Sequence, residues 1–152
     1  MNDCTVFDGK KFAEEIRSKV KDLGKKFIEK TGVTPGLAVV VVGDHPASKV
    51  YVRNKIKQTK EVGFNSIEHK LPEDVSEEKL LSIVGDLNDD KKINGILVQL
   101  PLPDHINSDV ILDKIDPSKD VDGFHATNVG KLWSGLNCLV PCTPLGCSLM
   151  IK

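Results

Sequence analysis

The sequence predicts an α/β domain of three layers, α/β/α, built around a mostly parallel sheet. Two continuous apolar runs, over residues 37–42 and 95–98, are typical of strands buried on both faces. The segments around them carry apolar residues at helical spacing, and strands that alternate with helices form parallel sheets covered on both sides. A length of 152 residues suits one domain, which buries enough surface to fold without a disulfide or a metal.

The chain is predicted to begin with a long amphipathic helix and a buried strand. The apolar residues of the helix recur at steps of three or four, and they are Phe12, Ile16, Val20, Leu23 and Phe27. Asp8 can cap the start of this helix and Gly32 can end it. The β-branched run 37–42 follows as the first strand, and Gly-Asp-His-Pro over 43–46 ends it.

A second helix, a second strand and a third helix are predicted next. The second helix extends from Ser48 to Val62, and Gly63 stops it. A short strand over 65–71 follows, after which Ser76 can cap the third helix. The apolar face of that helix consists of Leu80, Leu81, Val84 and Leu87.

The rest of the chain is predicted to hold one more strand and two more helices. A strand over 95–99 comes first and is closed by Pro101 and Pro103, and a helix over 108–115, capped by Asn107, follows it. A polar loop over 116–123 and a less regular stretch to residue 140 come next. The last segment is a helix opened by Thr143 and Pro144. Ligands of parallel α/β sheets bind beyond the carboxyl ends of the strands. We therefore expect functional residues within 45–48 and 99–103.

Charge is distributed unevenly along the chain. The net charge is −1, yet residues 1–60 carry thirteen Lys and Arg against seven Asp and Glu, and the remainder carries eight against fifteen. No basic run is interleaved with aromatic residues, so we expect no nucleic-acid partner. The basic first part can instead attract an anionic small molecule.

The sequence does not indicate a membrane or secreted protein. Its longest apolar runs are six residues or so, far shorter than a membrane span. The amino terminus, Met1-Asn2-Asp3-Cys4, lacks the basic and apolar segments of a secretory signal. We therefore expect a cytoplasmic protein with no membrane partner.

Four cysteines occur, and they are Cys4, Cys138, Cys142 and Cys147. The last three are spaced C-x3-C-x4-C, unlike the closely paired ligands of typical zinc sites. In a reducing compartment we expect free thiols and no bound metal. A metal-binding regulatory module that uses these three cysteines and His125 is an alternative with poor ligand spacing.

Three polar or reactive residues share one face of the predicted helix 48–62. Ser48, Tyr51 and Lys55 lie at positions i, i+3 and i+7. Their row starts just beyond the carboxyl end of the first strand, where a ligand pocket is expected. The alternative is a solvated helix face with one packed tyrosine.

Two further polar groups come from other segments. Gln99 ends an apolar strand, so its amide can orient a neighbouring amine or merely cap the strand. Asp120 and Asp122 lie beside Gly123, which indicates a tight turn with one carboxylate projecting. Such a carboxylate can accept paired N–H donors from a heterocycle, for example an aminopyrimidine. An ordinary acidic surface turn is the alternative.

Four motifs occur together here in the order of a known family. They are Ser48-x-x-Tyr51-Val-x-x-Lys55, Gly95-Ile-Leu-Val-Gln99-Leu-Pro101-Leu-Pro103, Lys119-Asp-Val-Asp122-Gly and Pro141-Cys-Thr-Pro-x-Gly-Cys147. On these motifs the chain closely resembles the N-terminal catalytic domain of the bifunctional methylenetetrahydrofolate dehydrogenase/methenyltetrahydrofolate cyclohydrolase family. The resemblance covers essentially the whole chain.

The resemblance implies an enzyme of one-carbon metabolism. Such an enzyme oxidises 5,10-methylenetetrahydrofolate to the methenyl form with NADP or NAD and hydrolyses that product to 10-formyltetrahydrofolate. Lys55 would be the central catalytic residue, Gln99 would hold its amine, and Tyr51 would stack on the folate and help hold Lys55. The implied substrate-binding residues are Ser48, Tyr51, Gln99, Pro101 and Asp122, of which Asp122 would anchor the pterin.

The same resemblance bears on cofactor and partners. In the family a second, Rossmann-type domain binds the cofactor through a Gly-Arg-Ser-x-x-Val-Gly loop at a helix N-terminus. We expect residues 1–152 to form the folate-binding catalytic domain, with that loop and all cofactor-binding residues absent from this chain. The resemblance implies NADP as cofactor, tetrahydrofolate derivatives as ligands, and a homodimer built largely through the second domain. A truncated, catalytically incomplete folate-binding fragment is the alternative.

Three basic residues of the helix 48–62 have two interpretations. Lys49, Arg53 and Lys57 can steer the glutamate tail of a folate electrostatically, or they can serve only as solvated surface charges.

Overall fold

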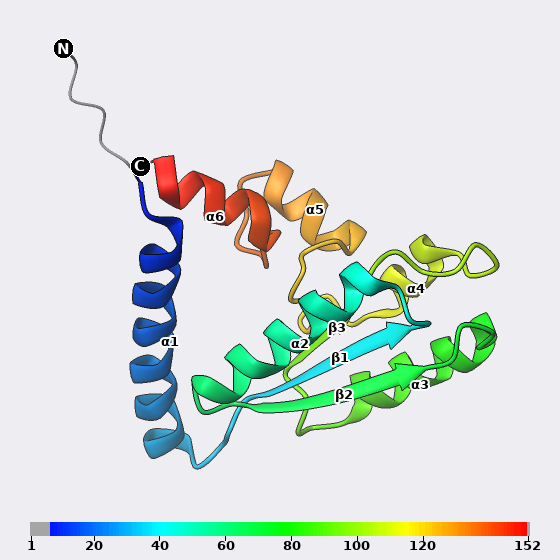
Figure 1. The fold of residues 1–152 in the computed structure, drawn as a ribbon, viewed down its shortest axis with the longest axis horizontal. Helices are drawn as coiled ribbons and strands as arrows, with labels where there is room; N and C mark the ends of the chain where they lie inside the picture. The colour runs from blue at the N-terminus through cyan, green and yellow to red at the C-terminus, as the bar shows by residue number, and fades with distance from the viewer. Residues whose placement is uncertain (1–6, 152) are drawn as a thin grey trace.

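The computed structural model describes residues 7–151, and a parallel sheet lies at its centre (Figure 1). Its strands are β1 (Gly36–Val42), β2 (Asn65–Leu71) and β3 (Gly95–Val98), arranged in the order β2-β1-β3. The central strand β1 pairs in parallel with both neighbours, so that Val40 lies opposite His69 on one side and Val98 on the other. This arrangement confirms the predicted α/β fold class.

Six helices are present in residues 7–151. They are α1 (Gly9–Thr31), α2 (Pro46–Glu61), α3 (Glu77–Asp89), α4 (Ser108–Lys114), α5 (Ala126–Trp133) and α6 (Cys142–Ile151). Helix α2 covers one face of the sheet, and α3 and α4 cover the other (Figure 1). None of these helices is both long and apolar enough to cross a membrane.

The central strand contributes to two separate cores. Successive residues of a strand point to opposite faces, and the even-numbered residues of 38–42 pack with Leu80 beneath α3 and α4. Val39 and Val41 point the other way and pack with Val52 of α2. Because both faces of β1 are covered, its sequence is apolar throughout, as a strand of this type requires.

Helix α1 begins and ends where the sequence predicts. The Asp8 carboxylate accepts hydrogen bonds from the backbone N–H groups of Lys10 and Lys11, at 3.0 and 3.1 Å. Gly32 ends the helix with a φ of +70°. The apolar stripe is less buried than its pattern suggests, since Leu23 is 65% exposed in the described structure. Helix α1 comes close to the residue before β2 at Gly24, where a Cβ would collide with the ring of Phe64.

The stretch 124–140, predicted to be irregular, contains the helix α5, so that prediction was wrong. The imidazole of His125 caps this helix, its Nδ1 accepting from the backbone N–H of Thr127 at 3.0 Å. Histidine is not among the usual cap residues and Gly130 lies inside the helix, so the sequence gives no clear start signal for it. Helix α2 also begins at Pro46, two residues before the predicted start, because proline suits the first helical position.

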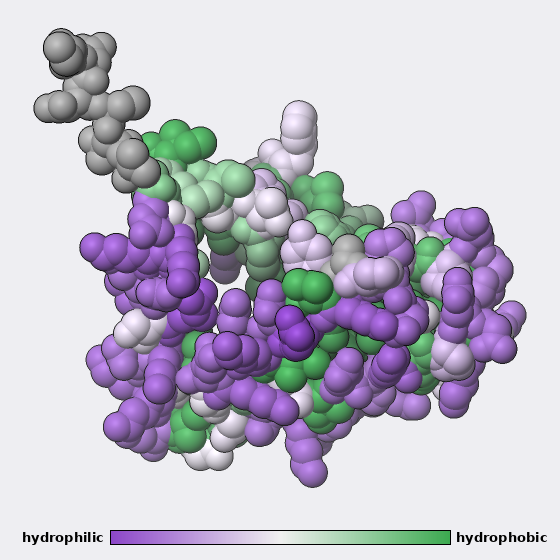
Figure 2. Space-filling view, in the orientation of Figure 1, coloured by the Kyte–Doolittle hydropathy of each residue, from purple (hydrophilic) through white to green (hydrophobic). Residues whose placement is uncertain are grey.

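Apolar side chains gather on the outer surface of α5, α6 and the segment between them. In the space-filling view this region holds much of the hydrophobic colour (Figure 2). The large exposed side chains there are Val129, Leu132, Trp133, Leu136, Leu139, Leu145, Leu149, Met150 and Ile151. In the described structure these helices therefore contribute little to the two cores.

We expect Ser76→Ala to lower the free energy of unfolding by about 1 kcal/mol, as loss of an N-cap typically does. The Ser76 hydroxyl accepts from the backbone N–H of Lys79 at 3.2 Å and so caps α3, whose inner face lies in the main core. Urea unfolding measures the change. Ser82→Ala, an exposed position within α3, is the matched control, and an equal loss at both sites would contradict the capping role.

Candidate active site

Lys55 and Gln99 meet at the carboxyl end of the sheet. The Lys55 ammonium donates to Oε1 of Gln99 at 3.3 Å, and Nε2 of Gln99 donates to the carbonyl of Leu100 at 2.8 Å. The backbone N–H of Gln99 also donates to the carbonyl of Val40 at 2.8 Å, which holds the residue beside β1. With both ends of its amide engaged, Gln99 presents an oxygen to the amine.

Packing of α2 on the sheet sets the position of Lys55. Val52 and Ile56 of α2 pack against the apolar face of β1 and β3. Lys55 directly precedes Ile56 in sequence, so its half-buried side chain extends from the side of the helix, next to the face that packs on the sheet. One turn earlier, Tyr51 is 61% exposed, whereas Ser48 in the first turn is buried. The predicted row therefore holds one buried hydroxyl, one exposed phenol and one amine.

The two aspartates of the turn 120–123 point in different directions. Asp120 is 1% exposed. Its carboxylate accepts from the backbone N–H groups of Gly123 and His125 at 3.1 and 2.9 Å, and from the side-chain amide of Asn128 at 2.9 Å. Gly123 has a φ of +68°, and a Cβ there would lie 2.9 Å from the chain at Pro141. The turn is thus anchored by Asp120 and leaves Asp122 to project.

Asp122 lies near Lys55 and Cys142 in a partly desolvated environment. Burial raises the pKa of the Asp122 carboxyl above its ordinary value, the neighbouring Lys55 lowers it, and Asp120 raises it further. Burial also raises the pKa of the Cys142 thiol, and the negative charge of Asp122 adds to this rise. A ligand that donates N–H hydrogen bonds to the Asp122 carboxylate favours its charged form and so offsets the effect of burial.

Lys55, Asp122 and Cys142 border a cavity of about 410 Å³ between α2 and the sheet, which lies at the amino ends of β1 and β3 and includes no residue of the predicted segments 45–48 and 99–103. Its lining residues include Lys55, Asp122 and Cys142, and its wall is apolar at Leu37 and Leu97. A cavity of this size and kind accommodates a flat organic molecule whose polar edge meets a few placed groups. The arrangement combines an amine, a carboxylate and an apolar surface.

A comparison with known families identifies the family of this chain. The model described as tetrahydrofolate dehydrogenase/cyclohydrolase, catalytic domain, matches residues 7–122. The chain belongs to this family.

Relatives of this tetrahydrofolate dehydrogenase/cyclohydrolase domain are similar along nearly its whole length. The bifunctional protein FolD 2 of Roseobacter denitrificans is 55% identical over 149 residues, which is 98% of this chain and 50% of that relative. The bifunctional protein FolD of Dichelobacter nodosus is 55% identical over 147 residues, 97% of this chain and 50% of that protein. The chain thus spans about half the length of the curated relatives it matches.

Solved structures agree in fold. The bifunctional enzyme FolD of Campylobacter jejuni, a methylenetetrahydrofolate dehydrogenase/cyclohydrolase, is 46% identical with a TM-score of 0.93, over 97% of this chain and 52% of that one. The methylenetetrahydrofolate dehydrogenase-cyclohydrolase of Trypanosoma brucei, complexed with NADP cofactor and inhibitor, is 36% identical with a TM-score of 0.89, over 94% of this chain and 49% of that one.

Other predicted site residues of this family member lie outside the cavity beside Lys55. Pro101, whose peptide bond with Leu100 is cis, borders a neighbouring cavity of about 360 Å³ with His45 and Leu102. Lys49, Arg53 and Lys57 line yet another pocket. Steering of a folate tail by these three residues stays a prediction.

Sequence reasoning considered Cys142 only as a ligand of the alternative metal-binding module, whereas the structure brings it beside Asp122. Its motif, Pro-Cys-Thr-Pro, was the available signal, but the motif alone does not say which carboxylate its thiol approaches. Cys138, Cys142 and Cys147 are free thiols. Within residues 7–151 no three His, Cys, Asp or Glu side chains are grouped to hold a metal ion. The alternative of a metal-binding module therefore has no support in this part of the chain.

Proposed function

We propose that residues 1–152 form the folate-binding, lysine-bearing domain of an enzyme that oxidises 5,10-methylenetetrahydrofolate to 5,10-methenyltetrahydrofolate and hydrolyses the latter to 10-formyltetrahydrofolate. The single observation that carries this proposal is the Lys55 amine bonded to Gln99 at 3.3 Å, beside the half-buried Asp122 and an apolar cavity. Family membership supports the same assignment.

In the proposed complex, Asp122 and Tyr51 bind the folate. The Asp122 carboxylate accepts hydrogen bonds from the amino and ring N–H groups of the pterin, a pairing that suits two parallel donors. The exposed ring of Tyr51 stacks on the aromatic part of the ligand, since offset stacking favours such contacts. Ser48 and Pro101 add contacts at the carboxyl ends of β1 and β3.

Lys55 acts on the one-carbon unit. In hydrolysis its amine positions the attacking water and assists proton transfer as the ring opens, which is the work of a general acid or base. Gln99 orients the amine through a neutral oxygen and therefore adds no charge next to a cationic methenyl substrate.

The turn from β1 into α2 does not suit the phosphates of a dinucleotide cofactor bound at a helix N-terminus. The turn from β1 into α2 is Gly-Asp-His-Pro over 43–46, where the Asp44 carboxylate repels an anion and Pro46, first in the helix, has no N–H to donate. We propose NADP as the hydride acceptor of the whole enzyme, held by residues outside this domain. A homodimer and a cytoplasmic location are proposed on the family resemblance alone.

A catalytically incomplete folate-binding fragment is a second candidate. The apolar side chains exposed on α5 and α6 favour it, because exposed patches of this kind mark surfaces that another element covers. Incubating the chain with methenyltetrahydrofolate and separating the products distinguishes the two. Formation of 10-formyltetrahydrofolate above the uncatalysed rate supports an active domain, and binding without turnover supports the fragment. Absence of both binding and turnover contradicts the proposed function.

We expect the stability difference between Asp122→Asn and the original chain to depend on pH. Because the folded pKa of Asp122 is raised, the folded chain holds this proton more tightly than the unfolded chain does. That contribution to stability is present below the ordinary pKa of 3.8 and is lost as pH rises through the folded pKa. The variant, which cannot ionise, should therefore gain stability relative to the original as pH rises. Urea unfolding at several pH values tests this, and a constant difference would contradict it.

A further inference from the structure

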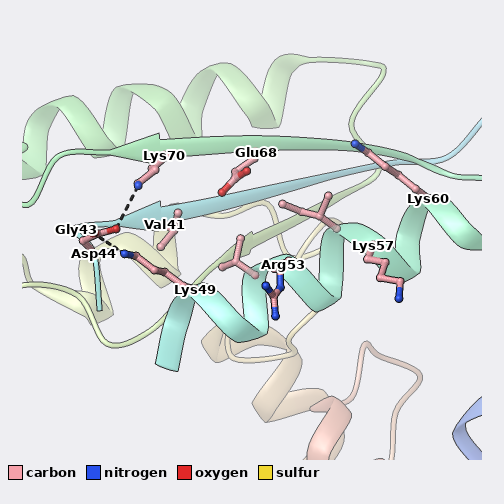
Figure 3. A pocket seen from close by; sticks show the side chains of 11 residues that line it. Val41, Gly43, Asp44, Lys49, Arg53, Lys57, Lys60, Glu68 and Lys70 are labelled. Carbon is pink, nitrogen blue, oxygen red and sulfur yellow. Dashed lines mark hydrogen bonds and ion pairs between the residues drawn. The ribbon is translucent and has the colours of Figure 1, made fainter. Parts of the chain in front are cut away.

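The pocket lined by Lys49, Arg53 and Lys57 is a cavity of about 430 Å³ on the other flank of α2, between that helix and the edge strand β2 (Figure 3). Its floor is apolar and consists of Val41, Val52 and Ile56. The residues along its rim are Gly43, Asp44, Lys49, Arg53, Lys57, Lys60, Glu68 and Lys70. We call this cavity the basic groove. Its volume falls within the range of small-molecule sites.

Helix α2 places a cation on the basic groove at every turn. Lys49, Arg53, Lys57 and Lys60 follow one another at steps of four, four and three residues, so they form one row about 16 Å long. From the opposite side, Lys70 of β2 lies in register with Val41 of the floor. Five cations and two carboxylates line the groove, an excess of three positive charges.

The carboxylates leave part of this charge uncompensated. Asp44 accepts from Lys49 at 2.6 Å and from Lys70 at 3.2 Å, and these contacts lower its pKa, so one carboxylate is shared by two cations at this end of the groove (Figure 3). At the other end, Lys57 has an ion-pair partner outside the groove, Glu61 at 3.7 Å. Within residues 7–151, Arg53 and Lys60 have no carboxylate within ion-pair distance.

The basic groove is separate from the candidate active site. Arg53 and Lys57 are each two residues from Lys55, which places them about 160° from it around α2. Lys55 and Asp122 line the cavity on one side of the helix, and no residue of that cavity lines the basic groove. A ligand in the groove therefore does not occupy the folate site.

We propose that the basic groove binds a small organic phosphate with an apolar or aromatic body and at least two phosphate charges, a nucleoside diphosphate being the simplest example. The body lies over Ile56 and the apolar stems of the rim lysines, above the buried Val41 and Val52, and the phosphates lie at Arg53 and Lys60. Arginine favours phosphate because its planar guanidinium donates two parallel hydrogen bonds. Both phosphate groups fit along the roughly 10 Å of helix between Arg53 and Lys60.

Binding of ADP, pyrophosphate and citrate to the full chain, measured by calorimetry at low salt, tests the ligand class. We expect saturable binding of ADP with a dissociation constant below about 1 mM. ADP should bind at least about threefold more tightly than pyrophosphate, because its body covers the apolar floor. Raised salt should weaken binding, because the groove is open to solvent. No saturable ADP binding, equal binding of pyrophosphate, or equal binding of citrate overturns the proposal.

Variants locate the ligand. The triple variant Arg53→Gln, Lys57→Gln, Lys60→Gln should weaken ADP binding at least about tenfold, and Glu68→Gln should tighten it about two- to fivefold. The matched control replaces three exposed lysines of α1, Lys19→Gln, Lys21→Gln and Lys26→Gln. It removes the same charge away from the groove. Equal weakening by the two triple variants would mean a nonspecific charge effect and would refute the site. A variant that fails to fold would bind ADP less tightly, whereas Glu68→Gln is expected to bind it more tightly. Tighter binding by this variant therefore cannot result from loss of folding.

Discussion

If the chain has the proposed cyclohydrolase activity, Lys55→Met should lower the rate of methenyltetrahydrofolate hydrolysis by a factor of about 10² to 10⁴, the usual contribution of a general acid or base. The substitution keeps the length and much of the apolar stem of the side chain but removes the amine that donates to Gln99 at 3.3 Å. Folate affinity should change little, because Asp122 and Tyr51 provide the proposed binding contacts. Product formation under single-turnover conditions measures the rate, and a separate titration measures affinity.

Two comparisons make the Lys55 result specific. Lys91→Met, in the exposed turn after α3, removes the same charge away from the site and should leave the rate unchanged. Gln99→Leu should lower the rate less than loss of the amine itself, since it frees the ammonium without removing it. Full hydrolysis by Lys55→Met would refute the assignment of this residue.

Asp120→Ala should lower the free energy of unfolding by about 3 kcal/mol, because it leaves buried donors without an acceptor. The donors are the backbone N–H groups of Gly123 and His125 and the amide of Asn128, at 3.1, 2.9 and 2.9 Å. All three belong to the turn that carries Asp122 or to the start of α5. Urea unfolding followed by circular dichroism measures the loss.

Asp122→Ala is the matched control for Asp120, because it removes a carboxylate from the same turn. Asp122 projects toward the cavity and its pKa is raised by burial, so its charge does not stabilise the fold. We expect a change below about 0.5 kcal/mol, together with weaker folate binding. Equal destabilisation by both variants would mean that Asp122 is also a structural residue and would contradict the division of roles.

Much of the fold follows from short-range patterns in the sequence. The apolar run at 37–42 predicts the central strand, and the spacing of Ser48, Tyr51 and Lys55 predicts their common helix face. Caps such as Ser76 mark helix starts, because each cap acts on N–H groups within three residues of itself. Helix α5 escaped prediction because its cap is a histidine, whereas Asn107, a usual cap residue, marks the start of the shorter helix α4.

The sequence indicated that one aspartate of the turn projects, but the choice of Asp122 came from family resemblance. In the structure Asp120 turns inward because its three donors lie within eight residues on one side of the turn. That geometry depends on α5 lying against the turn, which no local pattern describes. The approach of Cys142 to Asp122 depends on chain folding over twenty residues and is likewise invisible in the sequence.

Local chemistry along the chain accounts for the strands, most helices and the residue types of the candidate site, since each depends on neighbours within a few positions. Tertiary structure alone decides how these parts face one another. Gln99 reaches Lys55 across 44 residues because β1 and β3 pair in register. Packing of Val52 and Ile56 on the sheet sets the rotation of α2. That rotation turns Lys55 toward one cavity and Arg53 toward the other, so the cations of one helix border two different cavities.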